Sequence, residues 1–203
     1  MSKVRFDISM SLDGFITGPQ PRPEAPIGDD GGRLHLWLTG VADLRPEHRG
    51  TDKPEAAAIV AALYDTTGAL IMGRRMFDVG DPNWGENPPF GMPVFVLTHE
   101  RREPEPRLGG TTYHFVDDGI EAALARAREA AGDKDVNVQG GADVFRQYLG
   151  AGLIDEVQIH LVPTVLGTGT RLFDDRAGGP IDLDLGEVTQ AAGVAHVTMR
   201  LRT

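Results

Sequence analysis

The sequence predicts a three-layer α/β fold in which a mainly parallel central sheet has an antiparallel C-terminal edge. Apolar runs of strand length alternate with helical patterns through most of the chain, and this alternation is typical of parallel βαβ units. Residues 188–201 break the alternation, because strand patterns continue there without a helix and so predict one or two antiparallel edge strands. We expect a single domain over residues 1–203.

The clearest βαβ unit lies between residues 136 and 161. Residues 136–139 alternate valine with polar residues as a strand does, and Gly140 and Gly141 follow directly. A helical pattern over residues 144–149 ends at glycines, and a second strand pattern covers residues 157–161. The order is therefore strand, glycine pair, helix and strand.

A glycine pair between a strand and a helix can hold a phosphate group. Residues without Cβ let a ligand approach the backbone, and the free amides at a helix start attract an anion. The same order also fits a tight turn that binds nothing, so the pair alone leaves both interpretations open.

The composition excludes several classes of protein. The chain has 203 residues, 40% of them hydrophobic and 25% charged, which is typical of a globular protein. Its formal net charge of -10 argues against binding to nucleic acid or to an anionic membrane, because both need a basic face. The absence of cysteine excludes disulfides, thiolate metal sites and cysteine nucleophiles, and we expect no metal. We recognise no signal peptide or membrane span, so we expect a cytoplasmic protein.

The first 64 residues predict a strand, a long loop and two helical segments. Residues 4–10 alternate apolar and polar side chains as a strand does. Residues 17–33 are rich in Gly, Pro and Asp and predict a loop long enough to be functional, although a passive insertion also fits. Residues 34–38 predict one or two helical turns, in which Trp37 belongs to the core or walls a pocket. Residues 54–64 predict a helix that begins at its proline.

Two further strand ends carry suggestive chemistry. A buried strand over residues 68–72 runs into Gly-Arg-Arg at 73–75, and arginine forks suit phosphate oxygens, although an exposed charge pair is the alternative. The strand over residues 93–97 ends at Thr98. Ligands bind α/β sheets at the carboxyl ends of strands, so we expect these ends to lie beside the glycine pair. The remaining segments predict an irregular region at 81–89, a short strand at 112–115, a helix at 119–131 and a glycine turn at 167–170.

These motifs resemble the dihydrofolate reductase fold, and more closely the reductase domain of the bifunctional riboflavin-biosynthesis deaminase/reductase. The likeness covers nearly the whole chain and is strongest at Gln139-Gly140-Gly141. Residues 153–156 and 163–167 match as well, and residues 11–14 are similar to the start of the riboflavin-type reductase domain. The chain has no cysteine for a zinc-binding deaminase domain, so the resemblance predicts a stand-alone reductase.

The resemblance implies that NADPH is the cofactor and that it lies along the three strand ends. Gly140 and Gly141 would face the pyrophosphate, while Arg74, Arg75 and Thr98 would hold the adenosine phosphate. The implied cofactor-binding residues are Ser9 and Ile16 at the nicotinamide, Gly73, Arg74, Arg75, Thr98, Gln139, Gly140 and Gly141, and Ala142, Asp143 and Val144 through their amides.

On the substrate side the resemblance implies Asp13, Trp37, Asp81 and His35, in falling order. Gln139 stands where the riboflavin-type domain often has glutamate. By analogy, the function is that of an NADPH-dependent reductase similar to 5-amino-6-(5-phosphoribosylamino)uracil reductase, acting on a small heterocyclic or carbonyl substrate. The alternatives are a non-catalytic nucleotide-binding dimeric protein, dihydrofolate reductase proper, and a flavin-binding module.

The same resemblance bears on backbone geometry, cofactor preference and assembly. It implies that the Gly140–Gly141 peptide bond is cis. The two arginines at 74 and 75 favour NADPH over NADH by roughly tenfold or more, which is the effect of a charge-assisted phosphate contact. Riboflavin-type domains pair through the C-terminal region, so we expect a homodimer.

Overall fold

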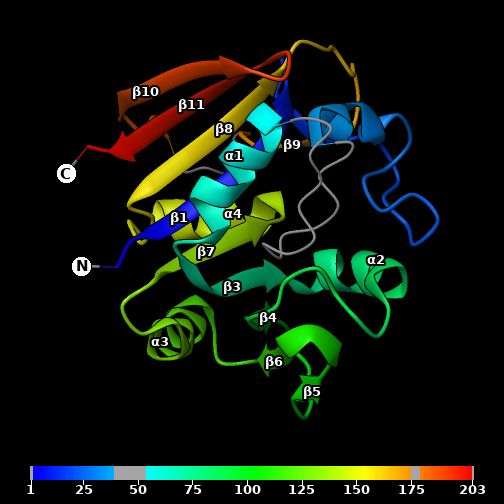
Figure 1. Ribbon diagram of the computed structural model, residues 1–203, viewed down its shortest axis with the longest axis vertical. Helices are drawn as coiled ribbons and strands as arrows, with labels where there is room; N and C mark the ends of the chain where they lie inside the picture. The colour runs from blue at the N-terminus through cyan, green and yellow to red at the C-terminus, as the bar shows by residue number, and fades with distance from the viewer. Residues whose placement is uncertain (1, 39–53, 175–178, 203) are drawn as a thin grey trace.

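The computed structural model describes residues 2–38, 54–174 and 179–202 as a layered α/β molecule (Figure 1). Within these ranges, the main sheet has the strand order β10-β11-β8-β1-β7-β3-β4-β6-β5, and a second sheet pairs β2 with β9. The strands are β1 (Val4–Ser11), β2 (Phe15–Thr17), β3 (Thr67–Gly73), β4 (Pro93–Leu97), β5 (Glu105–Pro106), β6 (Thr112–Val116), β7 (Asp135–Gly140), β8 (Glu156–Val162), β9 (Thr170–Arg171), β10 (Leu183–Ala191) and β11 (Val194–Leu201). The helices are η1 (Gly31–Leu38) and η3 (Leu108–Gly110), both 3₁₀, and α1 (Pro54–Tyr64), α2 (Arg74–Trp84), α3 (Ile120–Ala131) and α4 (Ala142–Gly150).

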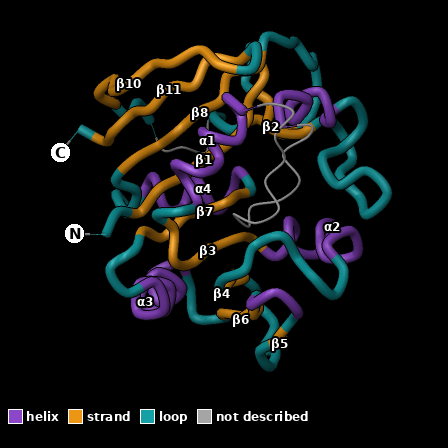
Figure 2. Tube along the Cα trace, viewed as in Figure 1, coloured by secondary structure: helices purple, strands orange, loops and turns teal. Residues whose placement is uncertain are grey.

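The direction of the strands confirms the predicted fold class. Strands β8, β1, β7, β3, β4 and β6 are parallel, whereas β11 and β10 add antiparallel pairs at one edge and β5 at the other. Figure 2 shows β10 and β5 at opposite ends of this row of strands. The carboxyl ends of the six parallel strands therefore lie along one edge of the sheet, where ligands of α/β proteins bind.

One face of the sheet is an apolar core covered by α3 and α4. Alternate residues of a strand point to the same face, and here they are Val4 and Phe6 of β1 with Val136 and Val138 of β7. The ring of Phe6 packs against Phe145 of α4 with 4.0 Å between centroids. These side chains are completely or almost completely buried, so this face supplies most of the hydrophobic stabilisation.

The opposite face, covered by α1, α2 and η1, has two different parts. Over β3, β4 and β6 it is apolar, with side chains such as Leu70, Val94 and Tyr113. Over β1, β7, β8 and β11 it carries buried or nearly buried polar side chains instead: Asp7, Ser9, Asn137, Gln139, His160 and His196. Buried polar groups require hydrogen-bond partners, so this polar part determines what packs over it.

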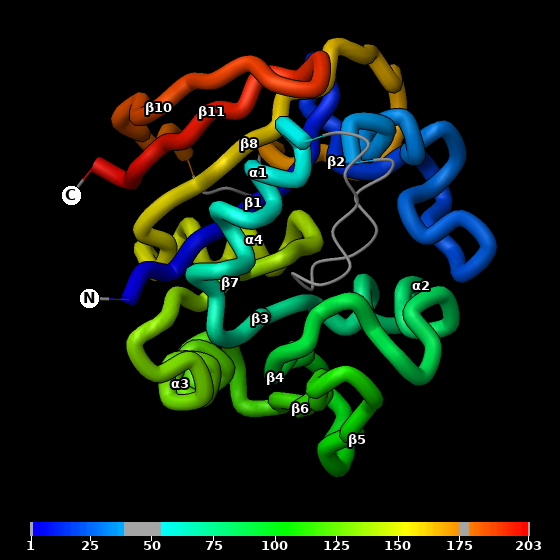
Figure 3. The backbone as a smooth tube through the Cα atoms, viewed as in Figure 1, coloured from blue at the N-terminus to red at the C-terminus, as the bar shows by residue number. Residues whose placement is uncertain are grey.

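The long loop after β2 lies at the same end of the molecule as α2 (Figure 3). The side-chain amide of Asn83 in α2 donates to the Pro23 carbonyl at 2.8 Å and fastens the loop there. The small sheet holds the start of the loop, because Phe15 in β2 pairs with Arg171 in β9. The guanidinium of Arg171 also lies 4.4 Å above the Phe15 ring. The sequence did not predict these two short strands.

The prediction of an irregular segment at 81–89 is wrong for residues 81–84, which continue α2 to Trp84. The fixed φ of Pro82 is compatible with a helix, and its loss of one amide donor does not stop α2 at once. The helix ends at Gly85, whose positive φ of 61° closes the last turn while its amide donates to the Asp81 carbonyl. No helix in the described ranges is long and apolar enough to cross a membrane.

We expect Phe145→Ala to lower the free energy of unfolding by about 3–5 kcal/mol, because it leaves a cavity beside Phe6 in a fully buried site. Phe173→Ala is the control: the Phe173 ring contacts Phe145 but is 40% exposed, so its removal should have a much smaller effect. Urea unfolding of both variants measures the difference. Equal losses would contradict the assignment of the core to the α3–α4 face.

Candidate functional site

The predicted strand ends come together at one place. Met72 at the end of β3 pairs with Gly140 of β7, and Gly73 pairs with Leu97 of β4. A Cβ added to Gly73 would lie 3.8 Å from the carbonyl oxygen of Gly140 and from the amide nitrogen of Gly141. The three strand ends are therefore in contact, as the sequence predicted.

The glycine pair forms an open backbone turn into α4. Its peptide bond is cis, which confirms the expectation from the resemblance. Gly140 has φ +123°, a conformation that side chains rarely allow, and a Cβ on Gly141 would meet no atom within 4 Å. No side chain caps α4, so the amides of its first turn, residues 142–144, are available to a ligand. An anionic group fits beside this turn.

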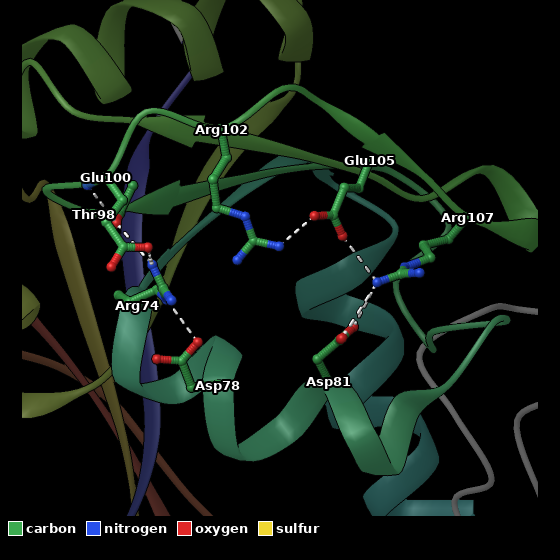
Figure 4. A network of polar contacts seen from close by, with 8 residues as sticks. All are labelled: Arg74, Asp78, Asp81, Thr98, Glu100, Arg102, Glu105 and Arg107. Atoms are coloured by element: carbon green, nitrogen blue, oxygen red, sulfur yellow. Dashed lines mark hydrogen bonds and ion pairs between the residues drawn. The ribbon is translucent and has the colours of Figure 1, made fainter.

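Arg74 starts α2 beside the glycine pair and is already paired with carboxylates (Figure 4). Its Nε donates to Asp78 Oδ1 at 2.6 Å, and its Nη1 donates to Glu100 Oε2 at 2.7 Å and to Thr98 Oγ1 at 3.2 Å. These carboxylates, Asp78 first, raise the pKa of Arg74, and Arg74 lowers the pKa of Glu100. Arg75 is exposed and makes no ion pair within the described residues.

Asp81 lies in another part of the same network, away from the strand ends. Both its oxygens accept from Arg107, at 3.2 and 3.3 Å, and Arg107 also donates to Glu105 of β5. Arg102 pairs with Glu105 and stacks over the Phe115 ring at 4.0 Å. Figure 4 shows this group beside the Arg74 group, with Asp81 directed toward Arg107. The structure therefore places Asp81 in a contact between α2 and Arg107, the residue that follows β5.

Trp37 is both a core residue and the wall of a cavity, which joins the two interpretations of the sequence. It is 5% exposed, and its indole Nε1 donates to Ser9 Oγ at 2.9 Å. Its ring lies 4.6 Å from His160 and 5.0 Å from His196, between centroids. Trp37 also lines a cavity of about 280 Å³, together with Arg33, Leu36, residues 162–164 and residues 192–194.

A buried hydrogen-bonded chain, which we call the Asp7 chain, lies beneath Trp37. Asp7 Oδ2 faces His160 Nε2 at 2.9 Å, and the Nδ1 atoms of His160 and His196 face each other at 2.6 Å. His196 Nε2 faces the Ala191 carbonyl at 3.1 Å. Burial lowers the pKa of His196, and the bond to that carbonyl opposes the effect. The side chain of Asp7 is 15% exposed, whereas that of His160 is 3% exposed.

Each contact of the Asp7 chain requires one proton. The carbonyl of Ala191 and a carboxylate are acceptors only, and two bare or two protonated Nδ1 atoms would repel each other. Three protons therefore occupy the three gaps. One of these protons lies between the Nδ1 atoms of His160 and His196.

Further polar groups surround Trp37 and the Asp7 chain. Among the described residues, His35 has a buried Nδ1 without a hydrogen-bond partner, and burial first, then His160, lowers the pKa of His35 to about 4. His35 is therefore neutral at physiological pH. The amide of Gln139 donates to the hydroxyl of Tyr64, and both amide atoms of Asn137 are buried with no partner in the part of the chain that the structure describes. Such unpaired atoms in a buried layer mark a place where a ligand or water can bind.

Comparison with known proteins identifies the family. The RibD C-terminal domain family matches residues 2–194. The chain belongs to this family. Among curated proteins, the uncharacterized protein YyaP of Bacillus subtilis is 23% identical over 184 residues and covers 85% of this chain and 81% of its own.

Two solved structures share the RibD C-terminal domain fold. A putative riboflavin biosynthesis protein from Shewanella sp. PV-4 has a TM-score of 0.68 at 22% identity and covers 99% of both chains. Acinetobacter baumannii RibD has a TM-score of 0.64 at 18% identity, and the match covers this whole chain and 59% of that one. These similarities confirm the fold and the resemblance stated from the sequence.

The carboxylate of Asp13 is held by hydrogen bonds from its own turn and from the segment after β8. It accepts from Ser11 Oγ at 2.6 Å and from the amides of Leu166 and Gly167 at 3.1 and 2.7 Å. These bonds, that of Ser11 first, lower the pKa of Asp13 to about 2. Asp13 is therefore ionised at physiological pH and ties the turn after β1 to the segment after β8.

The remaining predicted residues divide between the glycine turn and the core. Ala142 and Val144 are buried at the start of α4, while Asp143 is exposed and pairs with Arg146. Ile16 is 4% exposed and belongs to the core cluster that includes α4. No group of three or more His, Asp or Glu residues in the described part of the chain could hold a metal ion.

We expect the hydrogen bond between His160 and His196 to be observable directly by ¹⁵N NMR of histidine-labelled protein. At neutral pH a scalar coupling should connect the two Nδ1 nuclei, because one proton lies between them. His35, whose Nδ1 has no partner among the described residues, is the internal control and should show none. Both Nδ1 atoms unprotonated, with no coupling, would contradict the assignment of one proton to each gap.

Proposed function

We propose that the protein is an NADPH-dependent reductase of the riboflavin-biosynthesis type that acts on a small heterocyclic or carbonyl substrate. Membership of the RibD C-terminal domain family supports a reductase. The observation that carries the proposal is the open glycine turn at the start of α4, which contacts the end of β3, the strand that pairs with β4. This is a place for the phosphates of a dinucleotide.

The residues at the strand ends fit NADPH. A Cβ would have free space at Gly141, so a pyrophosphate can reach the backbone there. The uncapped amides of α4 provide donors, and Arg75, exposed in the first turn of α2, provides a cation. When bound, NADPH supplies a hydride to the substrate, and the protein binds, orients and supplies the proton.

The polar groups around Trp37 suit the substrate half of this reaction. Neutral His35 presents an unpaired ring nitrogen that can hydrogen-bond a carbonyl or ring nitrogen. The Asp7 chain, whose Asp7 side chain is partly open to solvent, is the candidate source of the proton. The 280 Å³ cavity beside Trp37 suits a single small ring system. By analogy with the family, a ribosylamino-pyrimidine is the first substrate to test.

We expect Gly141→Ala to weaken NADPH binding at least tenfold, because its methyl group would occupy the open space proposed for the pyrophosphate. The fold should be retained, since the methyl group meets no protein atom within 4 Å. Gly150→Ala is the matched control, with equally free space at the far end of α4. Nicotinamide fluorescence titrations measure both affinities. Unchanged affinity in Gly141→Ala would exclude this site for the pyrophosphate.

We also propose that the protein is a homodimer. Leu185 and Val188 on the outermost strand β10 are 70% and 54% exposed, and an open apolar sheet edge favours pairing with a second copy. Light scattering should give twice the 21.9 kDa of the chain. Leu185→Asp should shift the mass toward that of the monomer, whereas Leu108→Asp, at a leucine that is 61% exposed on η3, should not. A monomeric wild type at micromolar concentration would exclude the dimer.

A further inference from the structure

The arginine that the family resemblance assigns to the adenosine phosphate is not a free cation. Arg74 lies between two carboxylates, Asp78 and Glu100 (Figure 4). Its Nη1 donates to both Thr98 and Glu100, which uses the two hydrogens of that nitrogen. A ribose 2′-phosphate would therefore meet an arginine that two carboxylates already occupy.

The two carboxylates reach Arg74 in different ways. Asp78 is four residues along α2 and forms an ordinary pair on the surface of that helix. Glu100 comes from the exit of β4, where its backbone amide donates to Thr98 Oγ1 at 3.1 Å. Thr98 thus fixes both the turn that carries Glu100 and one hydrogen of Arg74. Glu100 belongs to the strand end itself, beside the residues proposed to hold the adenosine half.

Glu100 is suited to discriminate between ribose groups. A carboxylate repels a phosphate but accepts a hydrogen bond from a ribose 2′-hydroxyl, as acidic residues do in dinucleotide sites that select NAD over NADP. Its side chain is 68% exposed, so it can leave Arg74 when a stronger anion arrives. Arg74 and Thr98 would remain to bind that anion.

We propose that Glu100 sets the dinucleotide preference of this site, by competing with a ribose 2′-phosphate for Arg74 and by accepting a hydrogen bond from a ribose 2′-hydroxyl. This rests on the proposed function, in which a dinucleotide binds along the strand ends. The two arginines alone predict a preference for NADPH of roughly tenfold or more. With Glu100 paired to Arg74, we expect the wild-type preference to be less than about tenfold.

The test compares the affinities of NADPH and NADH for wild type, Glu100→Gln and Glu103→Gln. Glu103 is exposed on the same segment and makes no ion pair or hydrogen bond among the described residues, so its variant removes one negative charge without freeing Arg74. Fluorescence titration at fixed ionic strength gives each dissociation constant, and thermal unfolding confirms that the variants are folded. We expect Glu100→Gln to shift the ratio of the two affinities about tenfold toward NADPH, and Glu103→Gln to leave it unchanged.

The outcomes separate this inference from the function on which it rests. An equal shift in both variants would mean a general charge effect and would overturn the role of Glu100. No shift in Glu100→Gln, with both dinucleotides bound by the wild type, would overturn it while retaining the reductase. Binding of neither dinucleotide to the wild type would overturn the proposed function, and this inference with it.

Discussion

The hydrogen-bonded chain from Asp7 through His160 and His196 to the Ala191 carbonyl is the contact on which one side of the molecule depends. It joins β1, β8 and β11 and terminates at the last residue of β10, so it links four strands through side chains as well as backbone. Desolvating such groups without partners would cost more free energy than the bonds contribute. The packing of η1 follows from this, because Trp37 covers both histidine rings and donates to Ser9 on the same face.

The two faces of the sheet differ in polarity: one is an apolar core and the other carries buried polar side chains. On the α3–α4 face, β1, β7 and β8 present only apolar residues, and this core stabilises the fold without any demand for hydrogen bonds. On the opposite face these same strands present Asp7, Asn137 and His160. Because a strand alternates its side chains, a stable core and a polar site can be built on the same strands. The parallel order then brings the strand ends beside this polar face.

Local sequence patterns predicted most helices and strands. The features that they did not predict depend on contacts between residues far apart in the sequence. Periodicity and glycines placed the helices at 54–64 and 119–131, the helix over 144–149 that the structure extends to 142–150, and the six parallel strands. The pairing of β2 with β9 joins segments more than 150 residues apart, so no local pattern indicates it. The Asp7 chain likewise joins residues 153 and 36 positions apart. One signal was present: His160 and His196 each lie in the middle of an apolar strand pattern, where a histidine needs a buried partner.

The chemistry of a residue type did not decide its role at the site; its neighbours did. Asp13 and Asp81 have the right chemistry for a proton donor, yet one is held ionised by Ser11 and backbone amides and the other pairs with Arg107. Asp7 differs because its hydrogen-bond partner is a histidine.

The groups that could bind an anion also depend on their neighbours. In a chain with a net charge of -10, an anion is attracted by local donors, not by the overall field. Backbone amides at α4 cannot be neutralised, whereas an arginine can, as Glu100 does for Arg74. The anion affinity of the glycine turn therefore does not depend on neighbouring side chains, whereas that of Arg74 is reduced by the carboxylates beside it.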